Sequence, residues 1–295
     1  MKKYITLLLS ICFLSNVSIS QIYDTNLVQH KTESYQGETF DVVYLSRKDK
    51  RVNAKYFAHE MNGKSVSERF DEFSKSNGVI LYTIGAYDDE YGQYKKAVGL
   101  SIDNGKIVNG TIANMDGLLI IYPTGGITTT NISKGDLRLS GGTAISEKSY
   151  DLKKGYELNQ FKKWAQEMRV SVYQTHLLAW NGQLQFKLSK EAYSNTSAGK
   201  QLRERRFLVI GMTKNEDVIH CLINYPKYNN LYDASETILN FLQNEKDIKV
   251  ISMTNIDTGA GDILGLFESN GKKSEKVTGP VSIENAGNLL VYYYK

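Results

Sequence analysis

The segment from Asn255 to Asp262 combines residue types that can carry out chemistry. Two carboxylates, Asp257 and Asp262, stand five positions apart, and such a pair can supply a general acid and a base, or a nucleophile with its helper. Gly259 and Gly261 lie between them, and glycines let the backbone approach a ligand closely or adopt positive φ. Since Asp and Gly are also ordinary turn residues, a strand-to-strand turn without catalytic function is the alternative interpretation.

The same segment contains an aspartic-protease signature, because Ile256 precedes Asp257-Thr258-Gly259-Ala260. Aspartic-protease chemistry requires two such aspartates that share a proton. The chain has no second Asp-Thr-Gly or Asp-Ser-Gly triplet. We therefore do not expect protease activity.

Three segments that lead into polar loops repeat one pattern, an amphipathic helix followed by a buried strand. The first helix begins after Ser65, with Glu68 in the capping-box position, and its strand over 79–82 opens into Thr83. The second helix spans 158–168 and precedes a strand over 170–173. The third helix starts at Asp233, with Glu236 completing a capping box, and its strand over 249–253 leads into Asn255.

Hairpin signals lie between these units, and two further strands are predicted over 207–211 and 218–223. The turns are Asn104-Gly105, Asn181-Gly182 and Asn270-Gly271. Alternating helices and strands with hairpins predict an α+β fold (mixed α/β), with a mixed sheet and helices packed against it. We expect one domain over 65–295, preceded by N-terminal strands over 21–64. Ligands of open α/β sheets tend to bind beyond the carboxyl ends of strands, where the three loops would lie.

The N-terminus has the layout of a cleavable secretory signal over 1–20. Lys2 and Lys3 precede an apolar stretch over 5–14, and Ser18-Ile19-Ser20 supplies small residues at the cleavage site. The residues before Cys12 make a poor lipobox, so we do not expect a lipid anchor. No later stretch is long enough for a membrane span. The sequence therefore predicts an exported protein, periplasmic or extracellular.

The charge balance of the chain excludes some partners. Without the signal the formal net charge is 34 − 32 = +2, with no clustered basic footprint, so no nucleic acid is expected. His220 and Cys221 stand side by side, but two residues are too few for a zinc ligand set. We expect neither a metal nor a cofactor. His176, which follows a predicted strand, could be a pH-active site residue or a structural one.

Several blocks resemble the phosphodiester glycosidase family, whose lysosomal member removes N-acetylglucosamine from a phosphodiester on mannose. The family's late Asn-Leu-Asp-Gly-Gly-Gly-Ser motif resembles the segment over 255–261, and its early Asn-Gly-Gly-Phe-Phe-Asp motif resembles the segment over 83–88. A hairpin over 98–106, a glutamine before a Leu-rich hairpin at 174–182, and an arginine-containing strand over 205–211 follow the family order. Thr83, Ile84, Thr258 and Ala260 depart from the motifs.

The resemblance implies a site for a carbohydrate or sugar-phosphate substrate. Asp257 would act as base or nucleophile, with Asp262 as the second carboxylate. Arg205 would stabilise the phosphate. The substrate-binding residues would be Asn255, Gly259, Gly261, Thr83, Gly85, Tyr87, Gln174 and Arg206.

Three functions of different classes are consistent with these residues. The first is hydrolysis of sugar-1-phosphodiester linkages in envelope or polysaccharide glycans. The second is glycan binding by a relative that has lost activity through the altered motifs. The third is a structural or partner-binding role in the cell envelope, which would require an exposed apolar patch.

Overall fold

The computed structural model describes residues 24–58, 63–88, 97–142, 148–256, 258, 262–267 and 283–295. The predicted signal over 1–20 lies outside these residues. So do Asp257, Gly259, Gly261 and the predicted Asn270-Gly271 turn.

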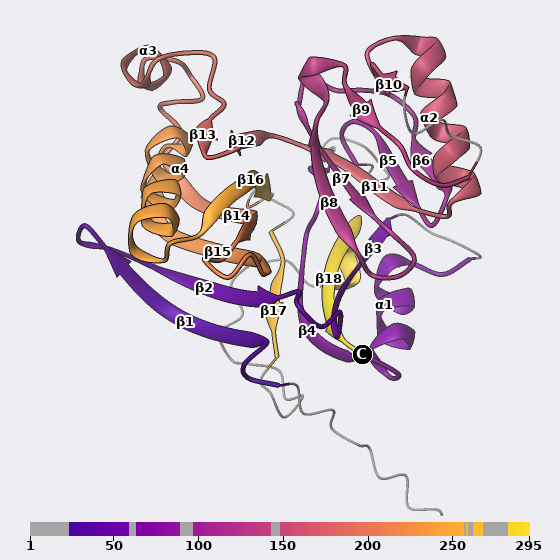
Figure 1. Cartoon of the computed structure of the whole chain (residues 1–295), viewed down its shortest axis with the longest axis horizontal. Coiled ribbons are helices and arrows are strands. Elements are labelled where there is room, and N and C mark those ends of the chain that lie inside the picture. Colours follow the sequence, from indigo (N-terminus) through magenta and orange to yellow (C-terminus); the bar gives the residue numbers. More distant parts are fainter. Residues whose placement is uncertain are drawn as a thin grey trace, which may run out of the picture.

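A seven-stranded antiparallel sheet occupies one side of the molecule (Figure 1). Its strands, in spatial order, are β1 (Val28–Tyr35), β2 (Glu38–Ser46), β15 (Val218–Asn229), β14 (Arg203–Met212), β16 (Lys249–Ile256), β12 (Leu177–Trp180) and β13 (Gln183–Leu184). Helix α4 (Leu231–Asn240) buries Ala234, Ile238 and Leu239 in the same apolar cluster as Phe207 and Cys221 of the sheet. The short helix α3 (Lys190–Ser194) lies next to α4.

Two smaller sheets form the other side of the molecule (Figure 1). The five-stranded sheet has the order β6 (Lys106–Asn109), β5 (Ser101–Asp103), β11 (Ser171–Thr175), β7 (Gly117–Ile121) and β8 (Ile127–Asn131). Helix α2 (Gly155–Glu167) buries Phe161, Trp164 and Ala165 against it. A short two-stranded sheet, β9 (Leu137–Arg138) with β10 (Ser149–Tyr150), adjoins this helix.

The four-stranded sheet contains the C-terminal strand. Its order is β17 (Leu264–Leu266), β4 (Gly78–Thr83), β18 (Asn288–Tyr294) and β3 (Val52–Ala58). Helix α1 (Val66–Ser74) packs Val66 and Phe70 with residues of this sheet. The central apolar cluster combines side chains of all three larger sheets, including Leu208, Tyr173 and Tyr292, and thus joins the two sides.

The predicted capping box and two predicted turns are confirmed. Ser65 accepts from the Glu68 backbone N–H at the start of α1, while the Glu68 carboxylate accepts from the Ser65 backbone. Asn104-Gly105 and Asn181-Gly182 both have positive φ at the two central positions, as type I′ hairpin turns require. The third helix, however, is not capped at Asp233. Asn230 accepts from the Asp233 backbone N–H, so α4 starts earlier than predicted.

The predicted mixed sheet is wrong, because every strand pair among the described residues is antiparallel. The three helix–strand units place their strands β4, β11 and β16 in three different sheets. No two of these strands therefore pair as the parallel partners of a βαβ unit. The result is a strand-rich α+β fold.

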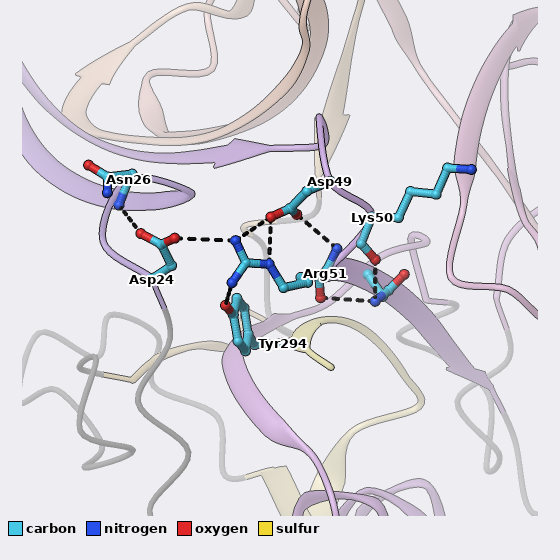
Figure 2. Close-up of polar contacts among 7 residues, drawn as sticks. Asp24, Asn26, Asp49, Lys50, Arg51 and Tyr294 are labelled. Carbon is cyan, nitrogen blue, oxygen red and sulfur yellow. Dashed lines mark hydrogen bonds and ion pairs between the residues drawn. The ribbon is translucent and has the colours of Figure 1, made fainter.

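Polar contacts of Arg51 join the first described residues to the C-terminal strand (Figure 2). Its guanidinium donates to Asp49 Oδ2 at 2.5 Å and to the Tyr294 hydroxyl at 2.6 Å, and it lies 3.3 Å from Asp24 Oδ2. These groups are partly exposed to solvent, so we expect the ion pairs to add little stability. None of the described helices is both long and apolar enough to cross a membrane.

Candidate active site

The exits of the three helix–strand units converge on one cavity of about 430 Å³. Tyr87 follows β4, His176 lies between β11 and β12, and Asn255 is near the end of β16; all three line the cavity. In Figure 1 the chain between β11 and β12 crosses from the five-stranded sheet to the seven-stranded sheet. The cavity therefore lies where the sheets meet, and its volume suits a small ligand.

Tyr87, His176 and Asn255 contact one another. The Asn255 side-chain amide donates to the Tyr87 hydroxyl, and the Asn255 backbone N–H donates to the His176 carbonyl at 3.0 Å. The rings of Tyr87 and His176 lie edge to face, with centroids 5.5 Å apart. These contacts fix an amide, a phenol and an imidazole in one wall of the cavity.

The side-chain carbonyl oxygen of Asn255 is buried and has no hydrogen-bond partner among the described residues. A buried acceptor without a donor costs about 1–3 kcal/mol. The cost disappears if water or a ligand hydroxyl donates to this oxygen. Asn255 therefore offers an acceptor to a molecule in the cavity.

Arg205 is buried in the cavity wall without a carboxylate partner among the described residues. Its guanidinium donates to the carbonyl of Gln201 at 2.7 Å and to that of Asn229 at 3.2 Å. Burial, followed by repulsion from Arg203, lowers the pKa of Arg205 to about 10. The side chain consequently stays charged at neutral pH, and its charge is available to an anion.

The charges around the cavity favour an anionic ligand. Arg203 and Lys187 line it together with Arg205, whereas Asp116 is the one acidic residue that lines it in the described part of the chain. Asp116 lies 3.5 Å from Lys153 Nζ. Burial lowers the pKa of His176, an effect that the charge of Asp116 opposes, so the imidazole is neutral at pH 7.

Arg206 and Asp262 form a buried pair that does not line this cavity. Arg206 Nη1 donates to Asp262 Oδ1 at 2.5 Å, while Nε and Nη2 donate to the Asn224 side chain at 3.2 and 3.0 Å. The same Nη1 lies 3.4 Å from the Thr83 hydroxyl. These contacts join β14 to β4 and to the segment that starts at Asp262.

Gln174 is also enclosed by protein. Its amide accepts from the backbone of Leu100 and Ala113 and donates to the carbonyls of Ala113 and Met115, at 2.5–3.1 Å. It thereby holds the segment from which Asn114, Met115 and Asp116 line the cavity. These contacts of Gln174 thus position the wall of the cavity.

Gly85 is held inside the protein by Asn288. A Cβ at Gly85 would lie 3.1 Å from the Tyr56 ring and 3.3 Å from Asn288 Oδ1. The Asn288 side chain accepts from the backbone N–H groups of Gly85 and Ala86, and it donates to the Ala86 carbonyl. Asn288 therefore fixes the loop that presents Tyr87.

The structure thus brings three of the predicted site residues, Arg205, Asn255 and Tyr87, into one cavity. Asp257, Gly259 and Gly261 lie outside the described residues, although Asn255 and Thr258 on either side of Asp257 line the cavity. Sequence reasoning missed Asp116, Arg203 and Asn288. The position of Asp116 directly before a buried strand is only a weak indication of a site residue. No sequence feature indicated the role of Asn288, because its hydrogen-bond partners are about 200 positions away in the chain.

No group of three or more His, Cys, Asp or Glu residues in the described ranges could hold a metal ion. No family model matches the chain, and no curated protein matches it.

Three solved structures resemble the chain at low sequence identity. One is the zebrafish N-acetylglucosamine-1-phosphodiester alpha-N-acetylglucosaminidase catalytic domain auto-inhibited by its pro-peptide, with 12% identity, a TM-score of 0.48, and coverage of 91% of this chain and 82% of that one. A hypothetical protein from Synechocystis has 9% identity and a TM-score of 0.48, covering 91% and 62%. A protein of Burkholderia pseudomallei assigned to the exported class has 10% identity and a TM-score of 0.49, covering 88% and 75%.

Proposed function

We propose that this protein is an exported glycosidase that hydrolyses sugar-1-phosphodiester linkages in envelope or polysaccharide glycans. The observation that carries the proposal is Arg205, a buried cation without a carboxylate partner among the described residues, in a cavity that Asn255 and Tyr87 also line. A guanidinium binds phosphate through paired hydrogen bonds, and an amide with a free carbonyl binds a sugar hydroxyl. The motif resemblance in the sequence points to the same substrate class.

In the proposed reaction, water attacks the anomeric carbon, and the bond between that carbon and the phosphate oxygen breaks. The phosphate monoester leaves with the bonding electron pair, and Arg205 stabilises its charge. Asp257 either accepts the proton of the attacking water or attacks first as a nucleophile, with water then releasing the sugar. Tyr87 stacks against the sugar ring, while Asn255 accepts from a sugar hydroxyl.

Asp116 is a second carboxylate that the proposed reaction can use. It lines the cavity and raises the pKa of His176 through its charge, opposing the larger effect of burial. In contrast, the Asp262 carboxylate binds Arg206 in the interior. The proposed acid–base pair is therefore Asp257 with Asp116, and Asp262 has a positioning role in the protein interior.

The predicted export is consistent with this function, because phosphodiester-linked glycans are found in the cell envelope and beyond it. The prediction of export rests on the signal layout over 1–20. Expression of the whole chain with its N-terminus intact tests the export. We expect the protein in the periplasm or medium, shortened at Gln21; full-length protein retained in the cytoplasm would contradict export.

The test of activity is incubation of the chain lacking residues 1–20 with a panel of sugar-1-phosphodiesters, followed by assay of free sugar. Arg205→Met should lower kcat/KM by about 100- to 1,000-fold, the usual loss when one stabilising donor is removed. Asp257→Asn should abolish release. Arg138→Met is the matched control, because this exposed arginine on β9 does not line the cavity. Full activity of Arg205→Met or Asp257→Asn would refute the assigned roles.

Glycan binding without hydrolysis is the second candidate. The departures at Thr83 and Ile84 from the family's early motif favour it. Saturable binding of a sugar-1-phosphodiester, weakened by Arg205→Met and without release of sugar across the panel, would identify the protein as a binder.

A further inference from the structure

We propose that the phosphodiester substrate carries an apolar aglycone, a long alkyl or isoprenoid-like alcohol esterified to the phosphate. This inference rests on the proposed function and names the group on the far side of the phosphate from the sugar. It follows from the second wall of the same cavity, which the reaction proposed above does not use.

That second wall consists mainly of apolar side chains. It is lined by Leu178 of β12, Leu231 at the start of α4, Phe186 and Leu188 of the segment between β13 and α3, and Tyr193 of α3, with the polar Gln185 and Lys187 among them. Phe186 packs against the Tyr193 ring at a centroid distance of 5.1 Å and against Tyr232 at 4.6 Å. Phe186 and Leu231 also pack against the apolar cluster beneath them, to which Leu178 belongs.

Arg205 lines the cavity together with Tyr193 of the apolar wall and Tyr87 of the polar wall. A phosphate bound by Arg205 would therefore share the cavity with the sugar-binding side chains and with the apolar side chains. A phosphodiester has two substituents, and this cavity offers two chemically different surfaces for them.

The apolar wall reaches the surface, because Leu188 lines the cavity and is 45% exposed. A small polar aglycone such as a sugar would leave this leucine in contact with water. An alkyl chain would cover it and could extend beyond the cavity, as a lipid chain does when its other end stays in a membrane or micelle. Burial of apolar surface provides the affinity.

The decisive measurement is binding of leaving-group analogues, which does not depend on turnover. Methyl, butyl, hexyl and octyl phosphate are titrated into the chain lacking residues 1–20 by calorimetry, below their micelle concentrations. We expect Kd to fall by up to about fourfold per added methylene, the value for full burial of a CH₂. Octanol without the phosphate should bind much more weakly than octyl phosphate, because it lacks the group that Arg205 binds.

Two variants separate the apolar wall from the rest. Leu188→Ser should reduce octyl phosphate affinity by about tenfold and leave methyl phosphate unchanged, and it should fold because the side chain is partly exposed. Phe186→Ala should have the same selectivity. Tyr156→Ser is the control, since Tyr156 is an exposed apolar residue on α2, outside the cavity.

The outcomes distinguish this inference from the proposed function. Equal Kd values along the series, or the same loss for methyl and octyl phosphate in Leu188→Ser, would overturn the apolar aglycone, and sugar release from any sugar-1-phosphodiester would leave the hydrolase standing. Chain-length-dependent binding that Leu188→Ser abolishes would support the ligand class even if no sugar were released. In that case the hydrolytic step alone would be refuted.

Discussion

The buried histidine His220 makes the stability of the fold depend on pH. His220 lies on β15 with 1% of its surface exposed, and its Nδ1 is 2.9 Å from the Tyr292 hydroxyl of β18. Burial, followed by repulsion from Arg47, lowers its pKa to about 3. The folded protein therefore keeps this imidazole neutral at pH values where the unfolded chain, with a pKa near 6.5, binds a proton.

The sign and size of the effect follow from this difference. Between pH 6.5 and about 3 the unfolded state binds more protons, so the free energy of unfolding decreases as the pH falls through that range. Each pH unit costs about 1.4 kcal/mol, so His220 should remove about 2 kcal/mol of stability between pH 7.5 and pH 5. Above pH 7 it should have no effect.

The measurement is urea-induced unfolding at pH 7.5, 6.5 and 5 for the wild type and His220→Asn. Asparagine retains a polar atom near the position of Nδ1, but it does not titrate, so the variant should lose about 2 kcal/mol less than the wild type over this range. The variant is expected to be less stable at every pH because it is smaller, and only the slope is compared. Parallel curves for the two proteins would refute the reasoning, since they would mean that His220 is not the titrating group.

Three further substitutions test the polar groups around the site, each by urea unfolding. Asp262→Asn should cost about 1.5–3 kcal/mol, because it removes the nearer of the two carboxylates that pair with the buried Arg206, the other being Glu204 at 3.5 Å. Arg206→Met with Asp262→Leu should restore part of the loss. Unchanged stability with lost activity would instead indicate a catalytic Asp262. Asn288→Ala should cost about 1–3 kcal/mol of stability for each of the two buried backbone N–H groups that Asn288 binds. The substitution should also weaken ligand binding, and unaltered affinity would show that the loop carrying Tyr87 does not need Asn288. Gly99→Ala should cost about 1–3 kcal/mol or more, because φ is +81° and its Cβ would lie 2.5 Å from Gln174 Oε1; a neutral effect would contradict the packing.

Much of the local structure could be predicted because it depends on residues close in sequence. The capping box at Ser65 and Glu68 and the Asn104-Gly105 turn were predicted because their hydrogen bonds and positive φ angles involve only neighbouring residues. The pattern did not reveal that α4 is capped by Asn230, since Asp233 fits the same pattern. Asn230 is the cap of α4, because its side chain accepts from the backbone N–H of Asp233.

The convergence of the three loops is a tertiary property. The sequence indicated that loops follow the strands that end at 82, 173 and 253, and each loop region supplies a residue to the cavity. The pairing of the strands that precede these loops could not be predicted from the sequence, because long-range packing determines which strands pair. Parallel and antiparallel neighbours have the same hydrophobic pattern when both faces of a strand are buried.

The sequence by itself determined the helix–strand units, the hairpin turns, and the presence of two adjacent arginines on the strand β14. Only the tertiary structure decided what each arginine does. Successive side chains on a strand point to opposite faces, so one arginine must face the protein interior if the other faces the cavity. Arg206 is the interior one and binds Asp262, whereas Arg205 lines the cavity. That choice depends on which face of the seven-stranded sheet meets β4 and the Asp262 segment, contacts made by residues more than fifty positions away in the chain.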